Sequence, residues 1–457
     1  MSFTTHSIVH ALALAALSAA GLHAAPARAA TIPVANCADS GPGSLREAVA
    51  GAGEGDILDM TAISCFTVRL LSPIVIEQDN LDIGFYPRGN QVGMIEIDAQ
   101  HNGRVFLHNG AGRLRLENLI LFNGLHSAAL ATGGCVHSEG DLELYRTYLW
   151  DCEARGEGGA EPMALGGAVH ARNVLLHGGS ILDNVASGAN GFGGGISSEG
   201  RTRLLYADVN SNRARNGGGI HTMGGLTMTY SNVWANNAYD NAGIHVLAGS
   251  VTIAKSTLAV NTATHRCGAV CVEGTGRTSI LDSTLSLNRA RWLSAGDLTH
   301  DAKISNSTIT QNTDTAADQC VGVVRARGEI TLMSTILAGN FCNAPGTAYD
   351  LGGRPWLGDV FRGFSNFIGH SRLPLGPGSL RGDPRLGPLG QHGNLDLQVH
   401  MPLPDSPVID AGYNVYDRLY DERGPGYPRV VGAAPDIGAV EWSPDPAAST
   451  RIAPTAD

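Results

Sequence analysis

The sequence predicts an all-β fold, a right-handed parallel β-helix, and three observations support it. One segment recurs nine times between residues 118 and 340: a small or polar residue, any residue, an aliphatic residue and, three positions later, usually Asn. A glycine-rich turn leading into Val or Ile follows six of these copies. Glycine makes up 60 of 457 residues and charged residues only 16%, a composition that suits short strands and tight turns.

The nine copies define the coils of the predicted solenoid. Their starts are 24 to 32 residues apart, at Asn118, Thr147, Gly179, Ala207, Ser231, Ser256, Ser283, Ser307 and Ser334. A coil of this length fits three short strands and three turns, stacked at about 4.8 Å per coil. We expect the repeated asparagine to occupy a left-handed turn, with its side chain bonding to its equivalents on neighbouring coils.

The glycine-rich turns predict an outward row of side chains. In Gly217-Gly-Gly-Ile-His221 the glycines turn the chain, the isoleucine points into the core, and strand alternation then points the next residue outward. The candidate ligand-binding residues are the histidines of this row, which comprises His137, His170, Ser197, His221, His245 and Cys271. Metal capture, a pH-sensitive patch and sugar contacts are the functional interpretations. The alternative is an exposed position that accepts any polar side chain, and the pattern shows no carboxylate beside the histidines.

Both ends of the chain carry signals. The apolar run 8–22, followed by the A-x-A pattern at 27–29, is typical of a signal peptide, so we expect export to remove it. Residues 44–47 form a capping box for a short helix over the first coil. The expected organisation is a signal peptide over 1–30, an N-terminal cap and first coils over 31–115, central repeats over 116–343, last coils and an irregular C-terminal cap over 344–443, and a disordered tail over 444–457.

Eight cysteines favour disulfides in an exported chain. From their proximity in sequence we expect Cys37 to pair with Cys65, and Cys320 with Cys342. The Cys-x-x-x-Cys motif at 267–271 is compatible with zinc, but no second ligand pair follows at metal spacing, so we expect no metal.

The net charge of −11 and the lack of a basic stripe argue against nucleic acid as a partner.

Beyond the signal peptide no apolar run is long enough to cross a bilayer, so we expect no transmembrane segment. We expect a monomer, secreted, periplasmic or on the outer cell surface, with a glycan or a cell-envelope component as its partner. The overall charge disfavours acidic polysaccharides, although a local arginine patch can still bind one.

Three segments resemble known exported β-helix families. Cys37-Ala-Asp-Ser-Gly-Pro-Gly-Ser-Leu-Arg-Glu-Ala48 resembles the CSLREA-type N-terminal region, and the glycine-rich repeats resemble those of the polymorphic outer-membrane proteins. Ser406-Pro-Val-Ile-Asp-Ala-Gly412 and Asp436-Ile-Gly-Ala-Val-Glu441 resemble the choice-of-anchor Q region. The resemblance covers most of the chain after the signal peptide and implies fold and export rather than a particular activity. A polar tail replaces the sorting tail common in such relatives, which favours release or periplasmic retention.

Candidate catalytic residues are few. Asp151 and Asp183 share a register and resemble the paired carboxylates of pectin-cleaving hydrolases on this fold, although the other motifs of that family are missing. Lys255 and Arg266 resemble the base and the charge neutraliser of polysaccharide lyases, but nothing in their spacing shows that they converge. Solvated surface residues are the alternative interpretation in both cases.

The sequence therefore favours an exported β-helix that binds a glycan or a cell-envelope ligand without catalysis. The second hypothesis is a secreted polysaccharide lyase or glycoside hydrolase on the same scaffold. Three or more ionisable groups converging on one face would favour the enzyme, and a flat polar or aromatic face would favour binding. We expect no cofactor for the binding protein, and calcium only for a lyase.

Overall fold

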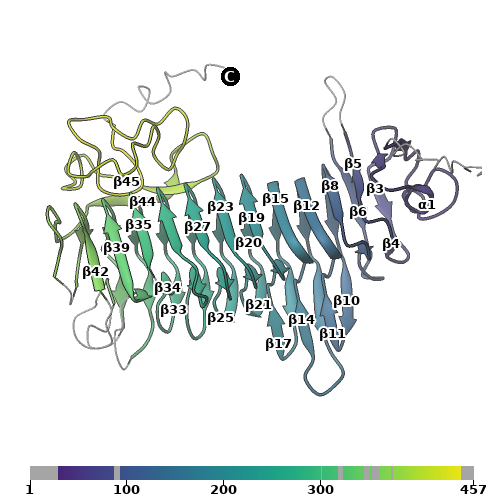
Figure 1. Cartoon of the computed structure of the whole chain (residues 1–457), viewed down its shortest axis with the longest axis horizontal. Coiled ribbons are helices and arrows are strands. Elements are labelled where there is room, and N and C mark those ends of the chain that lie inside the picture. The colour runs from purple at the N-terminus through teal and green to yellow at the C-terminus, as the bar shows by residue number, and fades with distance from the viewer. Residues whose placement is uncertain are drawn as a thin grey trace, which may run out of the picture.

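The computed structural model is a right-handed parallel β-helix of about 11 turns, drawn out into the rod of Figure 1. It describes residues 29–86, 93–299, 301–317, 323–343, 350–352, 360–371 and 374–443. The predicted signal peptide up to residue 28 and the predicted tail from residue 444 lie outside the described residues. The predicted fold class is confirmed, while the domain boundaries stay predictions.

Each central coil contains four short strands rather than the three we expected. A representative coil consists of β22 (Ile220–Thr222), β23 (Leu226–Thr229), β24 (Asn232–Trp234) and β25 (Asn237–Asp240). Equivalent strands of successive coils pair in parallel and form four stacks, which we number in chain order within a coil.

The strands of the four stacks have the following bounds. The first stack contains β4 (Ile74–Ile76), β7 (Phe106–His108), the start of β12 (Val136–Trp150), the start of β15 (Val169–Leu182), β18 (Ile196–Ser198), β22, β26 (Ile244–Val246), β30 (Val270–Val272), β34 (Gly296–Thr299) and β38 (Val324–Arg327). The second contains β1 (Thr31–Pro33), β2 (Ile57–Asp59), β5 (Leu81–Gly84), β8 (Arg113–Glu117), the middle of β12 and β15, β19 (Thr202–Leu205), β23, β27 (Val251–Ala254), β31 (Thr278–Leu281), β35 (Ala302–Ser305), β39 (Glu329–Met333) and β42 (Val360–Phe364).

The other two stacks complete the coils. The third contains β3 (Thr67–Arg69), β6 (Ile95–Asp98), β9 (Leu119–Phe122), the ends of β12 and β15, β20 (Asp208–Asn210), β24, β28 (Thr257–Ala259), β32 (Thr284–Ser286), β36 (Thr308–Thr310), β40 (Ile336–Leu337) and β43 (Phe367–Ile368). The fourth contains β10 (Leu125–Ala128), β13 (Glu153–Gly156), β16 (Val185–Ser187), β21 (Arg213–Asn216), β25, β29 (Thr262–Ala263), β33 (Arg289–Ala290), β37 (Thr313–Asp314) and β41 (Phe341–Cys342), with β11 (Leu130–Thr132), β14 (Met163–Leu165) and β17 (Asn190–Phe192) beside its first strands.

The core lies between the first three stacks, where aliphatic side chains from every coil point inward and are buried. Most of the side chains that the fourth stack buries are alanines, so the layer beneath it is thin. Glycine permits this close approach: a Cβ on Gly134 would lie 2.3 Å from the carbonyl oxygen of Gly167. At the turn into the first stack, Gly166 has a φ of +70°, a conformation that side chains disfavour.

The asparagine ladder is confirmed, but its backbone setting differs from the prediction. Asn236 is fully buried, donates from Nδ2 to Asn261 Oδ1 over 3.0 Å, and accepts at Oδ1 from Asn212 Nδ2 over 3.1 Å. The left-handed residue is the one before it, Ala235, with a φ of +55°. Of the repeat asparagines only Asn123 has a left-handed φ itself. The repeated asparagine therefore serves to satisfy buried backbone and amide groups rather than to make the turn.

The two ends of the rod are built differently. The helix α1 (Leu45–Gly51) covers the first coils, and its capping box is confirmed: Ser44 accepts from the Glu47 amide while Glu47 accepts from the Gly43 amide. The irregular C-terminal part is also confirmed. Residues 374–443, which we call the C-terminal segment, lie along the side of the rod over the third stack (Figure 1) and contain the hairpin β44 (Leu386–Gln391) and β45 (Gln398–Pro402).

The disulfide between Cys37 and Cys65 is confirmed. Two further disulfides join Cys135 to Cys152 and Cys267 to Cys271. Cys342 is also disulfide-bonded, and its predicted partner Cys320 lies outside the described residues. In the part of the chain that the structure describes, no helix is both long and apolar enough to cross a bilayer.

Candidate functional site

The predicted histidine row exists as a continuous ladder along the first stack, but it is buried rather than exposed. Strand pairing aligns its members one coil apart, and the ladder continues past Cys271 through Asp297 to Arg325. We call this row the polar corner; it comprises His137, His170, Ser197, His221, His245, Cys271, Asp297 and Arg325. His170, His221 and His245 are each at most 5% exposed because the row occupies the inner corner between the first and fourth stacks.

Carboxylates do stand beside the histidines, contrary to the expectation from the pattern. Glu139 Oε1 lies 3.0 Å from His137 Nε2, and Glu273 Oε1 lies 3.4 Å from His245 Nε2. A third glutamate, Glu199, lies 3.8 Å from His170. Each glutamate follows a row position by two residues, so strand alternation places it on the same face. That spacing is the sequence signal that would have revealed them.

One half of the polar corner is a connected chain of polar and charged groups. His221 Nδ1 and His245 Nδ1 are 3.1 Å apart, and His245 Nε2 lies 3.4 Å from Glu273 Oε1. Arg266 then links two acids, because it bonds Glu273 and lies 3.8 Å from Asp297. Arg325 completes the chain with two bonds to Asp297, of 3.0 and 2.5 Å. The structure thus brings Arg266 together with His221 and His245.

Burial lowers the pKa of three histidines of the polar corner, His137, His170 and His221. Desolvation, reinforced by the neighbouring His245, lowers the pKa of His221 to about 3, and desolvation, reinforced by His137, lowers that of His170 to about 4. The hydrogen bond from His245 and the charge of Arg266 lower the pKa of Glu273 to about 2. Glu273 is therefore a charged, weakly basic carboxylate that the guanidinium of Arg266 already neutralises.

The polar corner offers no good metal ligand set. Cys267, Cys271 and Asp297 place a ligand atom each within 4.8 Å of one another. The two sulfur atoms, however, are joined as a disulfide, and Asp297 is occupied by the guanidinium of Arg325. A bound cation would have to displace that guanidinium, so the residues do not fit zinc or calcium.

Lys255 lies in a different place from Arg266. It occupies the corner between the second and third stacks, beneath the C-terminal segment. Its Nζ donates to the carbonyl oxygens of Tyr420 and Asp421, both over 2.6 Å, and lies 3.7 Å from Asp282. With its donors engaged and its surroundings closed, this ammonium group holds the C-terminal segment in place.

Asp151 and Asp183 lie one coil apart, since the residues before them, Trp150 and Leu182, are paired. Both occupy the left-handed turn position, with φ of +52° and +55°, and both are exposed. Aspartate is one of the few residues that tolerate this conformation, which gives a structural reason for their presence.

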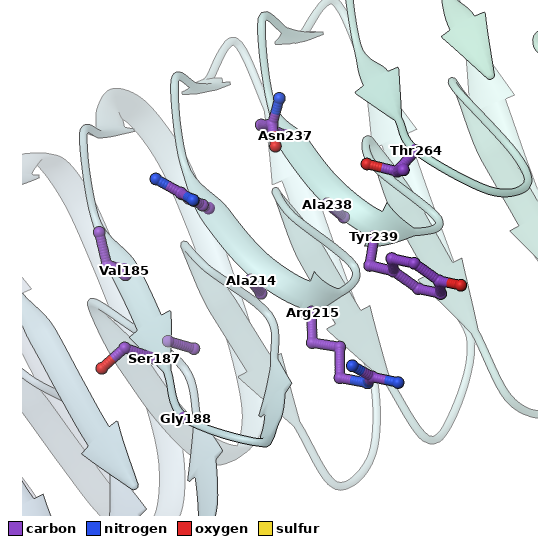
Figure 2. A pocket seen from close by; sticks show the side chains of 11 residues that line it. Val185, Ser187, Gly188, Ala214, Arg215, Asn237, Ala238, Tyr239 and Thr264 are labelled. Carbon is purple, nitrogen blue, oxygen red and sulfur yellow. The ribbon is translucent and has the colours of Figure 1, made fainter.

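An exposed groove on the outer face of the fourth stack carries a second group of functional side chains. Figure 2 shows the side chains of β21 and β25 projecting from adjacent strands into it. The groove has a volume of about 470 Å³, and we call it the arginine groove; its polar lining consists of Ser187, Arg213, Arg215, Asn237, Tyr239 and Thr264. Sequence analysis did not single out these residues, because they lie at outward positions that any polar residue can occupy.

Charge and aromatic surface are combined in this groove. The Arg215 guanidinium lies 5.0 Å from the ring centre of Tyr239, and that exposed ring stacks on His265, with 5.6 Å between their centres. Neither Arg213 nor Arg215 forms an ion pair with any of the described residues, and both are exposed. Arg155, two coils earlier, is instead bonded to Glu153 over 2.6 Å. The groove therefore presents cationic donors that are free to bind an anion.

Comparisons with known proteins leave both the family and the site of this chain open. No family model matches the chain, and no curated protein matches it. Among solved structures, the crystal structure of pectate lyase Pel9A is similar to it, with a TM-score of 0.43, 11% identity, and coverage of 91% of this chain and 98% of that one. At this level of similarity we draw nothing from the comparison about the site.

Proposed function

We propose that this chain is an exported β-helix protein that binds an acidic polysaccharide at the arginine groove without cleaving it. The observation that carries the proposal is the pair of exposed guanidinium groups, Arg213 and Arg215, which form no ion pair with any of the described residues; that of Arg215 lies 5.0 Å from the ring centre of the exposed Tyr239. A guanidinium matches the two oxygens of a carboxylate, and an aromatic ring offers a flat apolar face to a sugar ring. A uronate polymer supplies both groups in every unit.

The charge of the whole molecule makes this local patch selective. The net charge of −11 repels a polyanion over most of the surface, so only a cluster of free cations can hold one. Binding through exposed guanidinium groups is screened by salt and should weaken as ionic strength rises.

Disulfides support the proposed location outside the cytoplasm. All the described cysteines are disulfide-bonded, which fits an oxidising compartment. The proposed signal peptide and the resemblance to the CSLREA, choice-of-anchor Q and polymorphic outer-membrane families point the same way. We propose a monomer that is secreted, periplasmic or held at the outer cell surface.

A lyase is the less favoured alternative because its candidate base is engaged. Lys255 is closed off beneath the C-terminal segment, and the acids of the polar corner are neutralised by Arg266 and Arg325. Neither position offers a free base or a calcium site.

Isothermal titration of the purified protein with polygalacturonate and with neutral pullulan tests the proposed function. We expect polygalacturonate alone to bind, and the Arg215→Ala and Tyr239→Ala variants to bind at least about 10-fold more weakly. Arg172→Ala, which removes an exposed arginine elsewhere, is the matched control and should bind normally. Equal binding of both polymers, or unchanged binding by Arg215→Ala, would contradict the proposal.

A further inference from the structure

A second pocket, of about 270 Å³, lies where the C-terminal segment meets the outer face of the third stack. We call it the seam pocket, and the residues used below are Asp208, Asn232, Trp234, Gln391 and Asp396. None of its lining residues carries a positive charge, which distinguishes it from the arginine groove on the fourth stack. Its ligand must therefore be recognised by polar and stacking contacts.

Two carboxyl groups far apart in the sequence face this pocket. Asp208 belongs to β20, and Asp396 lies in the loop between β44 and β45. Asn232 ties the two elements together, because its Nδ2 donates to Asp208 Oδ1 over 2.7 Å and to the carbonyl oxygen of Asp396 over 2.8 Å. Gln391 Nε2 donates to Asp396 Oδ1 over 3.0 Å and so orients the second carboxylate.

One buried polar atom in the pocket wall lacks a partner. Asn232 is 8% exposed, and its Oδ1 has no hydrogen-bond donor among the described residues. The amide orientation is fixed by the two acceptors of Nδ2, so this oxygen cannot exchange places with the nitrogen. An unpaired buried acceptor is costly, and the hydroxyl group of a ligand would satisfy it.

Three aromatic side chains occupy one outward position of the third stack, although Leu182 and Asn210 stand between the second and the third. Phe122 and Trp150 are stacked, with 4.7 Å between their ring centres. Strand pairing continues this outward position through the next coils to Trp234, which is 37% exposed in the pocket wall. Flat aromatic faces spaced along an extended surface suit the rings of a sugar chain.

The two carboxyl groups have different environments. Asp208 is half-buried, and burial, followed by the nearby charge of Asp396, raises its pKa. Asp396 is exposed. Neither forms an ion pair within the described part of the chain. A buried carboxyl beside a solvated one is the difference in environment that separates the acid from the base in paired-carboxyl catalysis.

We propose that the seam pocket hydrolyses a glycosidic bond in a neutral polysaccharide, with Asp208 as general acid and Asp396 as general base. Asp208 gives its proton to the glycosidic oxygen as the bond from that oxygen to the anomeric carbon breaks. Asp396 takes a proton from the attacking water, whose oxygen forms the new bond to the anomeric carbon. One water is consumed, and each product carries one new hydroxyl group.

The test measures reducing ends released from xylan, galactomannan, pullulan and cello-oligosaccharides by the full chain. We expect release from one of these, and a loss of at least about 100-fold in each of the Asp208→Asn and Asp396→Asn variants. Asp417→Asn, an exposed carboxyl outside the pocket, is the control and should keep full activity. No release from any of the four polymers, or full activity in either pocket variant, would overturn the proposal.

A substrate with a good leaving group separates the two roles. On the dinitrophenyl glycoside of the sugar that the panel identifies, the departing oxygen needs no proton. Asp208→Asn should therefore regain activity there, whereas Asp396→Asn should not. The same loss in both variants on this substrate would overturn the assigned roles. Because Arg215→Ala leaves the seam pocket intact, unchanged hydrolysis in that variant keeps the test independent of polygalacturonate binding.

Discussion

The repeated coils and the C-terminal segment bury polar groups in two different ways. In the coils a buried group is satisfied by its own equivalent one coil away, as Asn236 is by Asn212 and Asn261. In the C-terminal segment a buried group has unlike partners far along the chain, as Glu422 accepts hydrogen bonds from Thr257 and Thr284. The first arrangement is periodic, so the same residue recurs at the same position of successive coils. The second arrangement depends on a single docking contact between distant parts of the chain.

The largest effect is expected in the coils. Asn236→Ala removes two bonds made by Nδ2 and two accepted by Oδ1, so the backbone N–H of Asn212 and the carbonyl oxygen of Val209 lose this buried partner, whereas Asn261 Oδ1 keeps the bond from the Asn236 backbone N–H. At about 1–3 kcal/mol for each unsatisfied group, the free energy of unfolding should fall by about 3 kcal/mol or more. Urea unfolding followed by circular dichroism measures the loss.

The neighbouring asparagine gives a matched control for that loss. Asn237 is exposed, so Asn237→Ala should change the urea midpoint little. If the two variants unfolded at the same urea concentration, the ladder would not stabilise the coils as described.

A somewhat smaller effect should be confined to the C-terminal segment. Lys255→Met removes the ammonium group that bonds the carbonyl oxygens of Tyr420 and Asp421 and faces buried Asp282. Arg418 Nε remains 3.5 Å from Asp282 Oδ2, so the carboxylate keeps a cation, and the loss of the bonds from the ammonium group should cost about 2 kcal/mol, which weakens docking of the segment rather than the coils. Limited proteolysis should cut residues 374–443 faster while far-UV circular dichroism stays the same. Equal cleavage of the variant and the wild type would show that Lys255 does not hold the segment.

Acid should weaken the coils through the polar corner. The pKa of His170 is about 4 in the folded chain against 6.5 when exposed, so between these values the unfolded chain binds more protons. The free energy of unfolding must therefore fall as pH drops from 6.5 towards 4, by on the order of 3 kcal/mol for this histidine alone. His170→Gln should flatten the pH dependence of the urea midpoint. The exposed His101, changed to Gln, should not, and a slope that survives in His170→Gln would contradict the account.

Raising the pH should weaken the docking of the C-terminal segment, whereas it stabilises the coils. Burial, reinforced by the charge of Asp421, raises the pKa of Glu422 well above its ordinary 4.5. The docked segment then binds more protons than the free one, so docking weakens as pH rises above 4.5. Glu422→Gln should make the rate of proteolysis of the segment less dependent on pH between 5 and 8. A rate that rises equally in both proteins would assign the effect to another group.

The same contrast explains what the sequence could predict. Periodicity revealed the coils, the asparagine ladder and the alignment of His221 with His245, because each position is repeated at a fixed spacing. It missed the burial of the polar corner, which depends on how sharply the first and fourth stacks meet. It also missed Asp396 and the cover over Lys255, because a docking partner more than 150 residues away leaves no periodic trace.

The arginine groove could be predicted from the sequence only in part. Its residues lie at outward positions of β21 and β25 that the repeat predicts. Their functional interest comes from a different fact: in the described coils no carboxylate lies opposite Arg213 or Arg215. Only the assembled stack shows this. Arg155 occupies a similar outward position on β13 but is paired with Glu153.

Hydrogen exchange of the backbone amides, measured with and without saturating polygalacturonate, tests the proposed function most directly. We predict slower exchange in β21 and β25 around Arg215 and Tyr239, weakening as salt is added, with no change in the third stack. Protection elsewhere with none at the groove, or no protection at all, would contradict the account.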